Sequence, residues 1–267
     1  MHPIERLRYL ARSSGGDPRV MVSETASALR GLGVDPAGLV VACRRIVERH
    51  PTCGPIWWLC AHMLTSTDPY RTARDRAEEI DADLTPEVLI DVLPADSTVC
   101  VIGWPDLAGE AILRRGDIRV LAVDADDQGS SFVRRLERAD VEAEVVEPGG
   151  IAAAVLAADL VIVEALAASP TELMVVRGAR AAASVAYCSE VPVWAVVGVG
   201  RVLPEAGFTS LVQRVADVRV PWQAEADVMP LALCSHVVTP SGAAAVEEVE
   251  LRAGCPLAHE LLRSSVM

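Results

Sequence analysis

Residues 96–112 read DSTVCVIGWPDLAGEAI. The first half, Thr98–Ile102, is a short run of β-branched and apolar residues, which is typical of a buried strand. Gly103 follows it where a tight turn is needed, and a helical pattern begins a few residues later. A continuous apolar strand that turns directly into a helix is a building block of a parallel sheet covered by helices. This stretch therefore predicts an α/β fold.

The chain after residue 94 repeats this pattern. Further apolar runs, separated by helical patterns, occupy residues 119–123, 142–146, 160–163 and 192–197. The alternation predicts a Rossmann-like, doubly wound parallel sheet over residues 94–267. Right-handed crossovers place the loops after the strands at one edge, where such sheets bind ligands. These loops span residues 103–109, 124–131, 164–178 and 198–204.

The chain before residue 94 has a different pattern of apolar residues. Apolar residues recur three and four apart, which predicts amphipathic helices and hence a helical domain over residues 1–93. Thr52 and Thr85 stand where a side chain caps a helix. The predicted helices cover residues 20–32, 36–49, 55–64 and 69–82, and a further one begins after Thr85.

The composition excludes several functions. The 37 acidic and 24 basic residues give a formal net charge of −13, which repels nucleic acid and anionic membranes. Every basic residue is arginine, because the sequence contains no lysine, so Schiff-base chemistry and a Walker-type phosphate loop are excluded. We therefore predict no direct nucleic-acid partner.

Localisation and cofactor follow from the same survey. Residues 1–10 lack the basic-then-apolar order of a signal peptide, and the most apolar stretch, 151–166, is interrupted by Asp159 and Glu164. We expect a cytoplasmic protein that makes no membrane contact. Seven cysteines without a CxxC pair and five scattered histidines favour reduced thiols over a metal site, so no metal and no cofactor is predicted.

The loop at residues 103–109 is a candidate ligand site. Gly103 permits a tight turn and Gly109 lets the helix approach closely, so the amides of the helix start can attract a phosphate. The spacing is not GxGxxG, however, and Pro105 removes one donor, which favours a purely structural turn. Asp124 ends the second strand where a ribose-binding acid would lie, and the alternative is a solvated turn with its acidic neighbours.

Two further groups of residues are candidates for anion binding. Arg177 and Arg180 flank Gly178 at a predicted helix start, where amides and guanidinium groups together can hold a phosphate. The alternative is a solvated face of an alanine-rich helix. Arg49 and His50 can supply a second wall from the helical domain, although the same segment also reads as an ordinary helix start.

Five segments, in order, resemble segments of one protein family. They are RHPTCGPIWWLCAHM (49–63), DSTVCVIGWPDLAGEAI (96–112), ADLVIVEALAAS (158–169), RGARAAASVAYCSEVPVWAV (177–196) and HVVTPSGAAAVEEVELRAG (236–254). The family includes the regulatory subunits of translation initiation factor 2B, methylthioribose-1-phosphate isomerase and ribose-1,5-bisphosphate isomerase. The resemblance implies a helical domain, a Rossmann-like domain that mediates dimerisation, and a phosphorylated sugar or nucleotide bound between them.

The resemblance also implies which working residues are absent. The family's isomerases use a cysteine after the first strand and an aspartate in a Gly-Ala-Asp motif. Trp104 or a close neighbour stands at the first position, and Glu164-Ala165-Leu166 replaces the motif. Of the family's Asn-Lys-x-Gly segment only Gly178 remains. Loss of an acid–base group typically costs ~10²–10⁴ in rate, so no catalytic residue is predicted.

The expected function is therefore that of a non-catalytic, homodimeric relative of the initiation-factor subunits, which binds a small phosphorylated ligand, a protein partner or both. The alternative is an aldose–ketose isomerase that rebuilt its site from Glu164, Asp124 or His50. The candidate ligand-binding residues are Arg49, His50, Thr52, Gly103, Trp104, Gly109, Asp124, Glu164, Arg177, Gly178 and Arg180.

Overall fold

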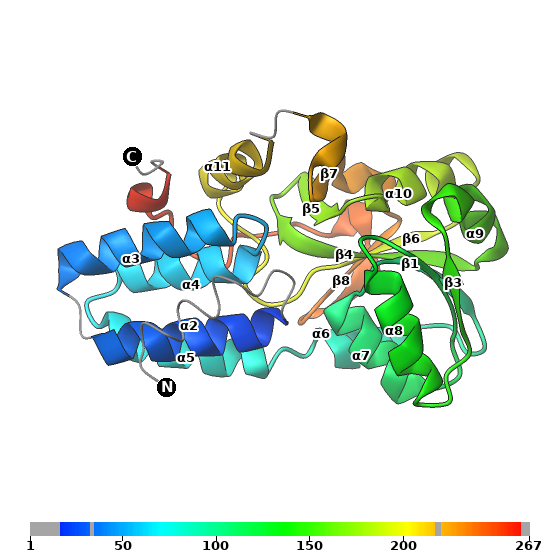
Figure 1. Cartoon of the computed structure of the whole chain (residues 1–267), viewed down its shortest axis with the longest axis horizontal. Coiled ribbons are helices and arrows are strands. Elements are labelled where there is room, and N and C mark those ends of the chain that lie inside the picture. The colour runs from blue at the N-terminus through cyan, green and yellow to red at the C-terminus, as the bar shows by residue number, and fades with distance from the viewer. Residues whose placement is uncertain (1–16, 33–34, 217–219, 263–267) are drawn as a thin grey trace.

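The computed structural model describes residues 17–32, 35–216 and 220–262. A group of helices forms one side of the molecule, and a twisted sheet with helices on both faces forms the other (Figure 1). This is the predicted α/β architecture, with a helical region followed by a mostly parallel sheet. Among the described residues, no helix has the length and apolarity that crossing a bilayer requires.

The helical side is built around α4 (Gly54–Thr65), whose residues are buried almost all round. Its apolar sequence, GPIWWLCAHMLT, needs neighbours on every face, and three helices supply them. Its N-cap is Cys53 rather than the predicted Thr52, and no side chain caps it; a proline in the first turn presets the backbone. The surrounding helices are α2 (Pro18–Leu32), α3 (Pro36–Arg49) and α5 (Pro69–Asp81).

The sheet contains the five predicted parallel strands and a sixth, at residues 236–239, that the apolar runs did not predict. Its strands run in the order β3-β2-β1-β4-β6-β8, all parallel, and β9 (Gly242–Ala245) pairs antiparallel with β8. The strands are β1 (Thr98–Ile102), β2 (Arg119–Val123), β3 (Ala143–Val146), β4 (Leu160–Ala168), β6 (Val193–Val196) and β8 (His236–Thr239).

Helices cover both faces of the sheet, because alternate strand residues point to opposite sides. Cys100 and Val161 lie in a core with α9 (Ile151–Ala157) and α10 (Ala179–Cys188). Val101 and Ile162 lie in the core on the other face. That second face is covered by α6 (Thr85–Val92), α7 (Asp106–Arg115) and α8 (Gln128–Glu137).

The loop predicted for residues 164–178 is wrong. There β4 continues through an irregularity between Ala165 and Ala167 and then turns back into β5 (Glu172–Val176), which runs antiparallel to it. The run ELMVV has the β-branched character of a strand. It also pairs on its other side with β7 (Ala226–Pro230), so a small antiparallel sheet extends the carboxyl end of β4.

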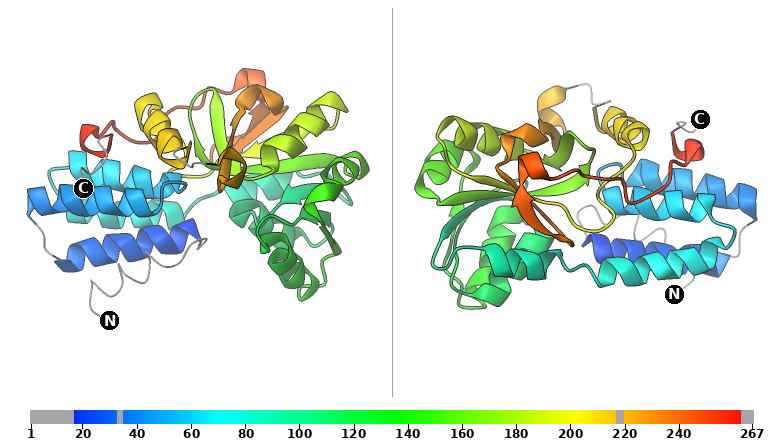
Figure 2. Two further views of the ribbon diagram at one scale, coloured as in Figure 1. Left: turned by 45° about the horizontal axis from the view of Figure 1, so that its top comes forward. Right: turned by 180° about the vertical axis from the view of Figure 1, so that it is seen from behind.

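The packing crosses the domain boundary expected at residue 93. The C-terminal segment runs back from the sheet over the helical side, as Figure 2 shows from behind, where the indole of Trp58 donates to the Gly254 carbonyl at 3.0 Å. Helix α11 (Glu205–Ala216) packs into the same helical core, whereas α6 packs on the sheet. The 3-10 turns are η1 (Pro148–Gly150), η2 (Pro221–Gln223), η3 (Leu231–Leu233), η4 (Val246–Glu248) and η5 (His259–Leu261).

Candidate functional site

A small cavity lies at the carboxyl edge of the parallel strands, where β1 and β6 end and β4 continues. Its volume is about 30 Å³, which corresponds to room for about two water molecules. The walls are mostly apolar, with two carboxylic acids among them. Residues that line it include Ile102, Trp104, Asp106, Glu164, Leu166 and Val176.

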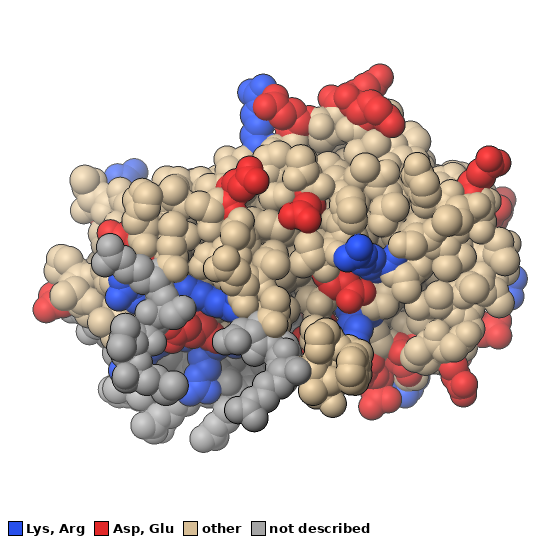
Figure 3. Space-filling model, turned by 90° about the horizontal axis from the view of Figure 1, so that it is seen from above, with Lys and Arg blue, Asp and Glu red and all other residues tan. Residues whose placement is uncertain are grey.

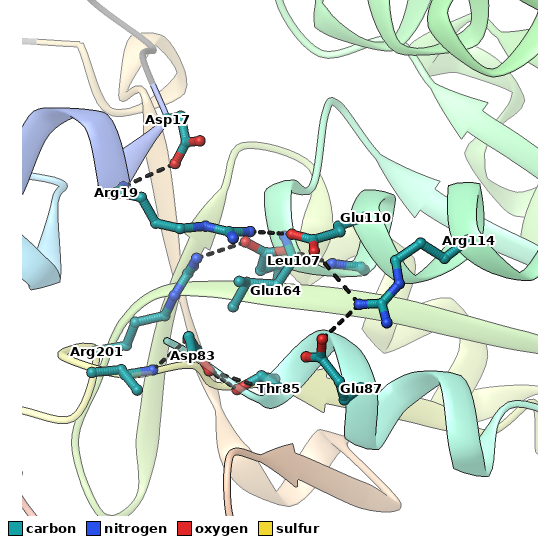
Figure 4. Close-up of polar contacts among 12 residues, drawn as sticks. Asp17, Arg19, Asp83, Thr85, Glu87, Leu107, Glu110, Arg114, Glu164 and Arg201 are labelled. Carbon is teal, nitrogen blue, oxygen red and sulfur yellow. Dashed lines mark hydrogen bonds and ion pairs between the residues drawn. The ribbon is translucent and has the colours of Figure 1, made fainter. Parts of the chain in front are cut away.

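Glu164 is held by three donors. Its Oε1 accepts from Nη2 of Arg201 at 2.8 Å, and its Oε2 accepts from the backbone amides of Leu107 and Ala108 at 2.9 and 3.1 Å (Figure 4). The two amides belong to the first turn of α7, where the helix dipole favours a negative charge. Both side chains are deeply buried, at 8% exposure for Glu164 and 4% for Arg201. Glu164 therefore ties β4 to the start of α7.

Asp106 is the second acid of the cavity and opens α7. Burial, and then the charge of Glu164, raise the pKa of its carboxyl to about 7, and Arg201 opposes this shift. The amides that normally receive an acid at a helix start are already bonded to Glu164. Within the described part of the chain, no hydrogen-bond donor reaches the Asp106 carboxyl to stabilise its charged form, and its raised pKa allows it to exchange a proton near neutral pH.

The loop that carries Arg201 is anchored by Asp83, which lies between α5 and α6. The Asp83 carboxylate accepts from the amide of Val199 at 2.8 Å, and from the amide and hydroxyl of Thr85 at 2.9 and 2.6 Å. There is no space for a side chain at Gly198, because a Cβ there would lie 2.4 Å from both Asp83 Oδ2 and Leu107 Cδ1. Arg201 is thus placed by a tightly packed turn.

The helical side meets the same region through α2. Arg19 pairs with Glu110, which lies one helical turn after Asp106 on α7. Oε1 of Glu110 is also 3.7 Å from Nη1 of Arg114 (Figure 4). Cys53 lies nearby, at the start of α4, and burial raises the pKa of its thiol to about 11, so the thiol stays protonated. The boundary between the two sides is therefore polar, and its charges are largely paired within the chain.

The predicted glycine loop builds the wall of the cavity. Gly103 has φ +65°, and its amide donates to the Val123 carbonyl at 2.8 Å, so this amide is not directed at a ligand. Trp104 lines the cavity and packs against Phe132 at 5.7 Å between ring centroids. A Cβ on Gly109 would lie 2.9 Å from the Phe132 ring, which shows the close approach that the sequence indicates.

The predicted arginine site lies near the cavity, but its donors are already used. Arg177 pairs with Asp126, and the Gly178 amide donates to Asp227 Oδ2 at 2.9 Å. Arg180 donates to the Val228 carbonyl at 2.9 Å. A phosphate at this helix start would have to replace two carboxylates of the chain itself.

The remaining predicted residues do not line the cavity. Asp124 accepts from the amide of Gly129 at 2.9 Å and from the Ser130 hydroxyl, so it caps the start of α8. Arg49 is exposed, and Thr52 lies in the turn that follows it. Burial, and then the charge of Arg49, lower the pKa of His50. This turn lies beside the cavity, since a Cβ on Gly54 would lie 2.6 Å from the carbonyl oxygen of the wall residue Leu166.

Sequence reasoning missed Asp106 and Arg201. Asp106 directly follows Pro105 at a predicted helix start, a position where acids are favoured, and Arg201 lies in the predicted edge loop 198–204. Their pairing with Glu164 depends on how β1, β4 and β6 are ordered in the sheet, which sequence patterns did not define.

On the face shown in Figure 3, the arginines that the structure describes are scattered among acidic side chains and form no continuous basic stripe. Over residues 17–32, 35–216 and 220–262, no group of three histidine, cysteine, aspartate or glutamate residues has the arrangement that a metal ion needs.

Comparison with known proteins places the fold. No family model matches the sequence, and no curated protein matches it. Among solved structures, the translation initiation factor eIF-2B of Pyrococcus horikoshii OT3 is similar with a TM-score of 0.74 and 14% identity, over 91% of this chain and 96% of that one. The eIF2B delta subunit of Chaetomium thermophilum is similar with a TM-score of 0.69 and 15% identity, over 90% of this chain and 97% of that one. The eIF2B beta2-delta2 complex of C. thermophilum contains a chain with a TM-score of 0.68 and 18% identity, over 92% of this chain and 90% of that one.

Proposed function

We propose that this chain, which has the fold of the translation initiation factor 2B subunits as the sequence resemblance predicts, is a non-catalytic member of that group. In this proposal it forms a homodimer through its Rossmann-like domain. It binds a small phosphorylated ligand, a protein partner or both, in the cytoplasm and without direct contact to nucleic acid or membrane.

One observation supports a protein without catalytic activity: both carboxylate oxygens of Glu164 already accept hydrogen bonds from other parts of the chain. One carboxylate oxygen accepts from Arg201, and the other accepts from two backbone amides in the first turn of α7. Turning this carboxylate toward a substrate would leave the buried Arg201 without its counter-charge, and breaking a buried ion pair in this way costs about 3–5 kcal/mol. Glu164 is therefore suited to hold the sheet edge together rather than to move a proton.

The proposal of a partner rests on the neighbours and on the surface. In C. thermophilum, eIF2B beta and delta form a tetrameric beta2-delta2 complex. Large apolar side chains are exposed on the Rossmann-like side at Leu156 of α9 (63%) and Tyr187 of α10 (63%), two helices that contact each other, and at Trp222 of η2 (81%). Aromatic side chains exposed in this way are typical of protein interfaces.

Replacing Tyr187 and Trp222 together with serine is expected to convert a dimer into a monomer, because the two side chains supply apolar contact area. Sedimentation equilibrium should give 56.8 kDa, which is 2 × 28.4 kDa, for the unaltered chain and 28.4 kDa for the variant. The matched control is Val20→Ser, which removes an exposed apolar side chain of α2. A monomeric unaltered chain would contradict the homodimer.

Binding of a phosphorylated ligand is expected to raise the melting temperature. A ligand at a hundredfold excess over its dissociation constant adds about 2.7 kcal/mol to the free energy of unfolding. The probes are ribose 1,5-bisphosphate, methylthioribose 1-phosphate and AMP. If Arg177 binds the phosphate, Arg177→Met should abolish the shift and Arg252→Met, at an exposed ion pair, should not. No shift with any probe would remove the ligand from the proposal.

A sugar-phosphate isomerase is the second candidate, and one observation favours it. Asp106 and Glu164 line the same cavity, and Asp106 titrates near neutral pH, as a general base requires. The two candidates differ in one measurable respect, since only an isomerase converts its ligand.

A further inference from the structure

At the boundary between the helical side and the sheet, the Asp106 carboxyl has no hydrogen-bond or ion-pair partner among the described residues. Asp106 stands at the start of α7, with Glu164 of β4 and Arg201 of the loop after β6 on one side of it. Asp17 and Arg19, at the start of α2, act on it from the helical side. Any charge on Asp106 therefore acts on both sides of the boundary.

The two guanidinium groups that face Asp106 already form hydrogen bonds or ion pairs with other groups. Arg201 is bonded to Glu164 and to the Ala165 carbonyl, and Arg19 is paired with Glu110. Cys53, at the start of α4, is a partly buried thiol whose pKa is raised to about 11, so it stays neutral and does not change the charge at the boundary. An ionised Asp106 thus adds a negative charge next to Glu164 that no free cation balances among the described residues.

We propose that proton uptake at Asp106 closes the boundary, which means that the helical side packs firmly against the sheet. Loss of this proton weakens that packing and favours local opening. When Asp106 is neutral, Glu164 is the carboxylate that pairs with Arg201, and α2 and the Asp83 turn stay packed against the sheet. When Asp106 is charged, it competes with Glu164 for Arg201 and repels Asp17 across the boundary. This response to pH requires no bound phosphorylated ligand.

The pH range over which the boundary opens follows from the environment of the Asp106 carboxyl. Burial and the charge of Glu164 place the pKa of Asp106 at about 7 when the boundary is closed, and opening returns it toward the ordinary aspartate range. The closed form therefore holds the proton more tightly, so that opening is favoured as the pH rises. Between pH 6 and pH 8 the opening equilibrium is expected to increase about tenfold, since only one group titrates.

Hydrogen exchange of individual amides tests this on the full chain. The amide of Val199 bonds to Asp83 across the boundary, and those of Leu107 and Ala108 bond to Glu164. After correction for the intrinsic pH dependence of exchange, NMR should show these amides exchanging about tenfold faster at pH 8 than at pH 6. The amide of Ala122, in strand β2 between β1 and β3, should show no such change.

Two variants test whether Asp106, and not another acid, causes the pH dependence of exchange. Asp106→Asn should keep the three amides protected at both pH values, and Asp91→Asn, which removes an exposed acid of α6, should behave as the unaltered chain does. Exchange that does not depend on pH in the unaltered chain would overturn the proposal. The same pH dependence in Asp106→Asn, or an equal increase at Ala122, would overturn it as well, because another group or global unfolding would then be responsible.

Discussion

Replacing Arg201 with methionine is expected to lower the free energy of unfolding by about 3–5 kcal/mol, because it leaves the buried carboxylate of Glu164 without its counter-charge. The partners are only 4% and 8% exposed, so water cannot take over the lost interaction. Asp106 aggravates the loss, since it places a second acid at the same cavity. Urea unfolding at pH 7, followed by circular dichroism, measures the change.

Two further variants isolate the cause. Arg252→Met removes an arginine whose ion pair is exposed at 81% and 72%, and it should leave the urea midpoint unchanged. The double variant Arg201→Met with Glu164→Gln should recover part of the loss, because the unpaired charge is gone. A loss below about 1 kcal/mol in Arg201→Met would show that Glu164 is not anchored in the way described here.

Asp106→Asn is expected to stabilise the chain more at pH 7 than at pH 5. The folded-state pKa of Asp106 is raised to about 7 from an ordinary value of 3.8, so the folded state binds the proton more tightly than the unfolded state does. Stability from this group is therefore present at low pH and lost as the pH rises through the range from about 4 to 7. Between pH 5 and pH 7 the loss amounts to about 2 kcal/mol, and asparagine does not suffer it.

The quantity to measure is the difference between variant and unaltered chain at each pH, since other carboxyl groups titrate in both. Urea unfolding at pH 5, 6 and 7 should show this difference growing with pH, and Asp91→Asn should show no such growth. A constant difference across the series would mean that Asp106 has an ordinary pKa.

The architecture was predictable because it depends on local patterns. The five parallel strands predicted from apolar runs are all present, and the helices of the first 93 residues begin and end within about two residues of their predicted limits. Residues 164–178 were missed as strands, because the glutamate at position 164 interrupts an apolar run that continues beyond it. That glutamate is tolerated inside a strand only because Arg201 and the start of α7 neutralise it.

The site was predictable only in part. Glu164 and Trp104 were identified, and both line the cavity. Asp106 and Arg201 were not, because each is unremarkable in its own segment and gains its role from a neighbour far along the chain. The arginines at 177 and 180 were identified for their charge, and the sequence did not show that Asp126 and the Val228 carbonyl would occupy them.

Binding without conversion is most directly tested by NMR in deuterated water with ribose 1,5-bisphosphate or methylthioribose 1-phosphate as the probe. We predict no ketose signal and no deuterium at carbon 2 beyond that seen in buffer alone, because Glu164 is committed to Arg201 and α7. Ketose formation that is lost in Asp106→Asn and retained in Asp91→Asn would contradict this account and would show that the two acids of the cavity form a working active site.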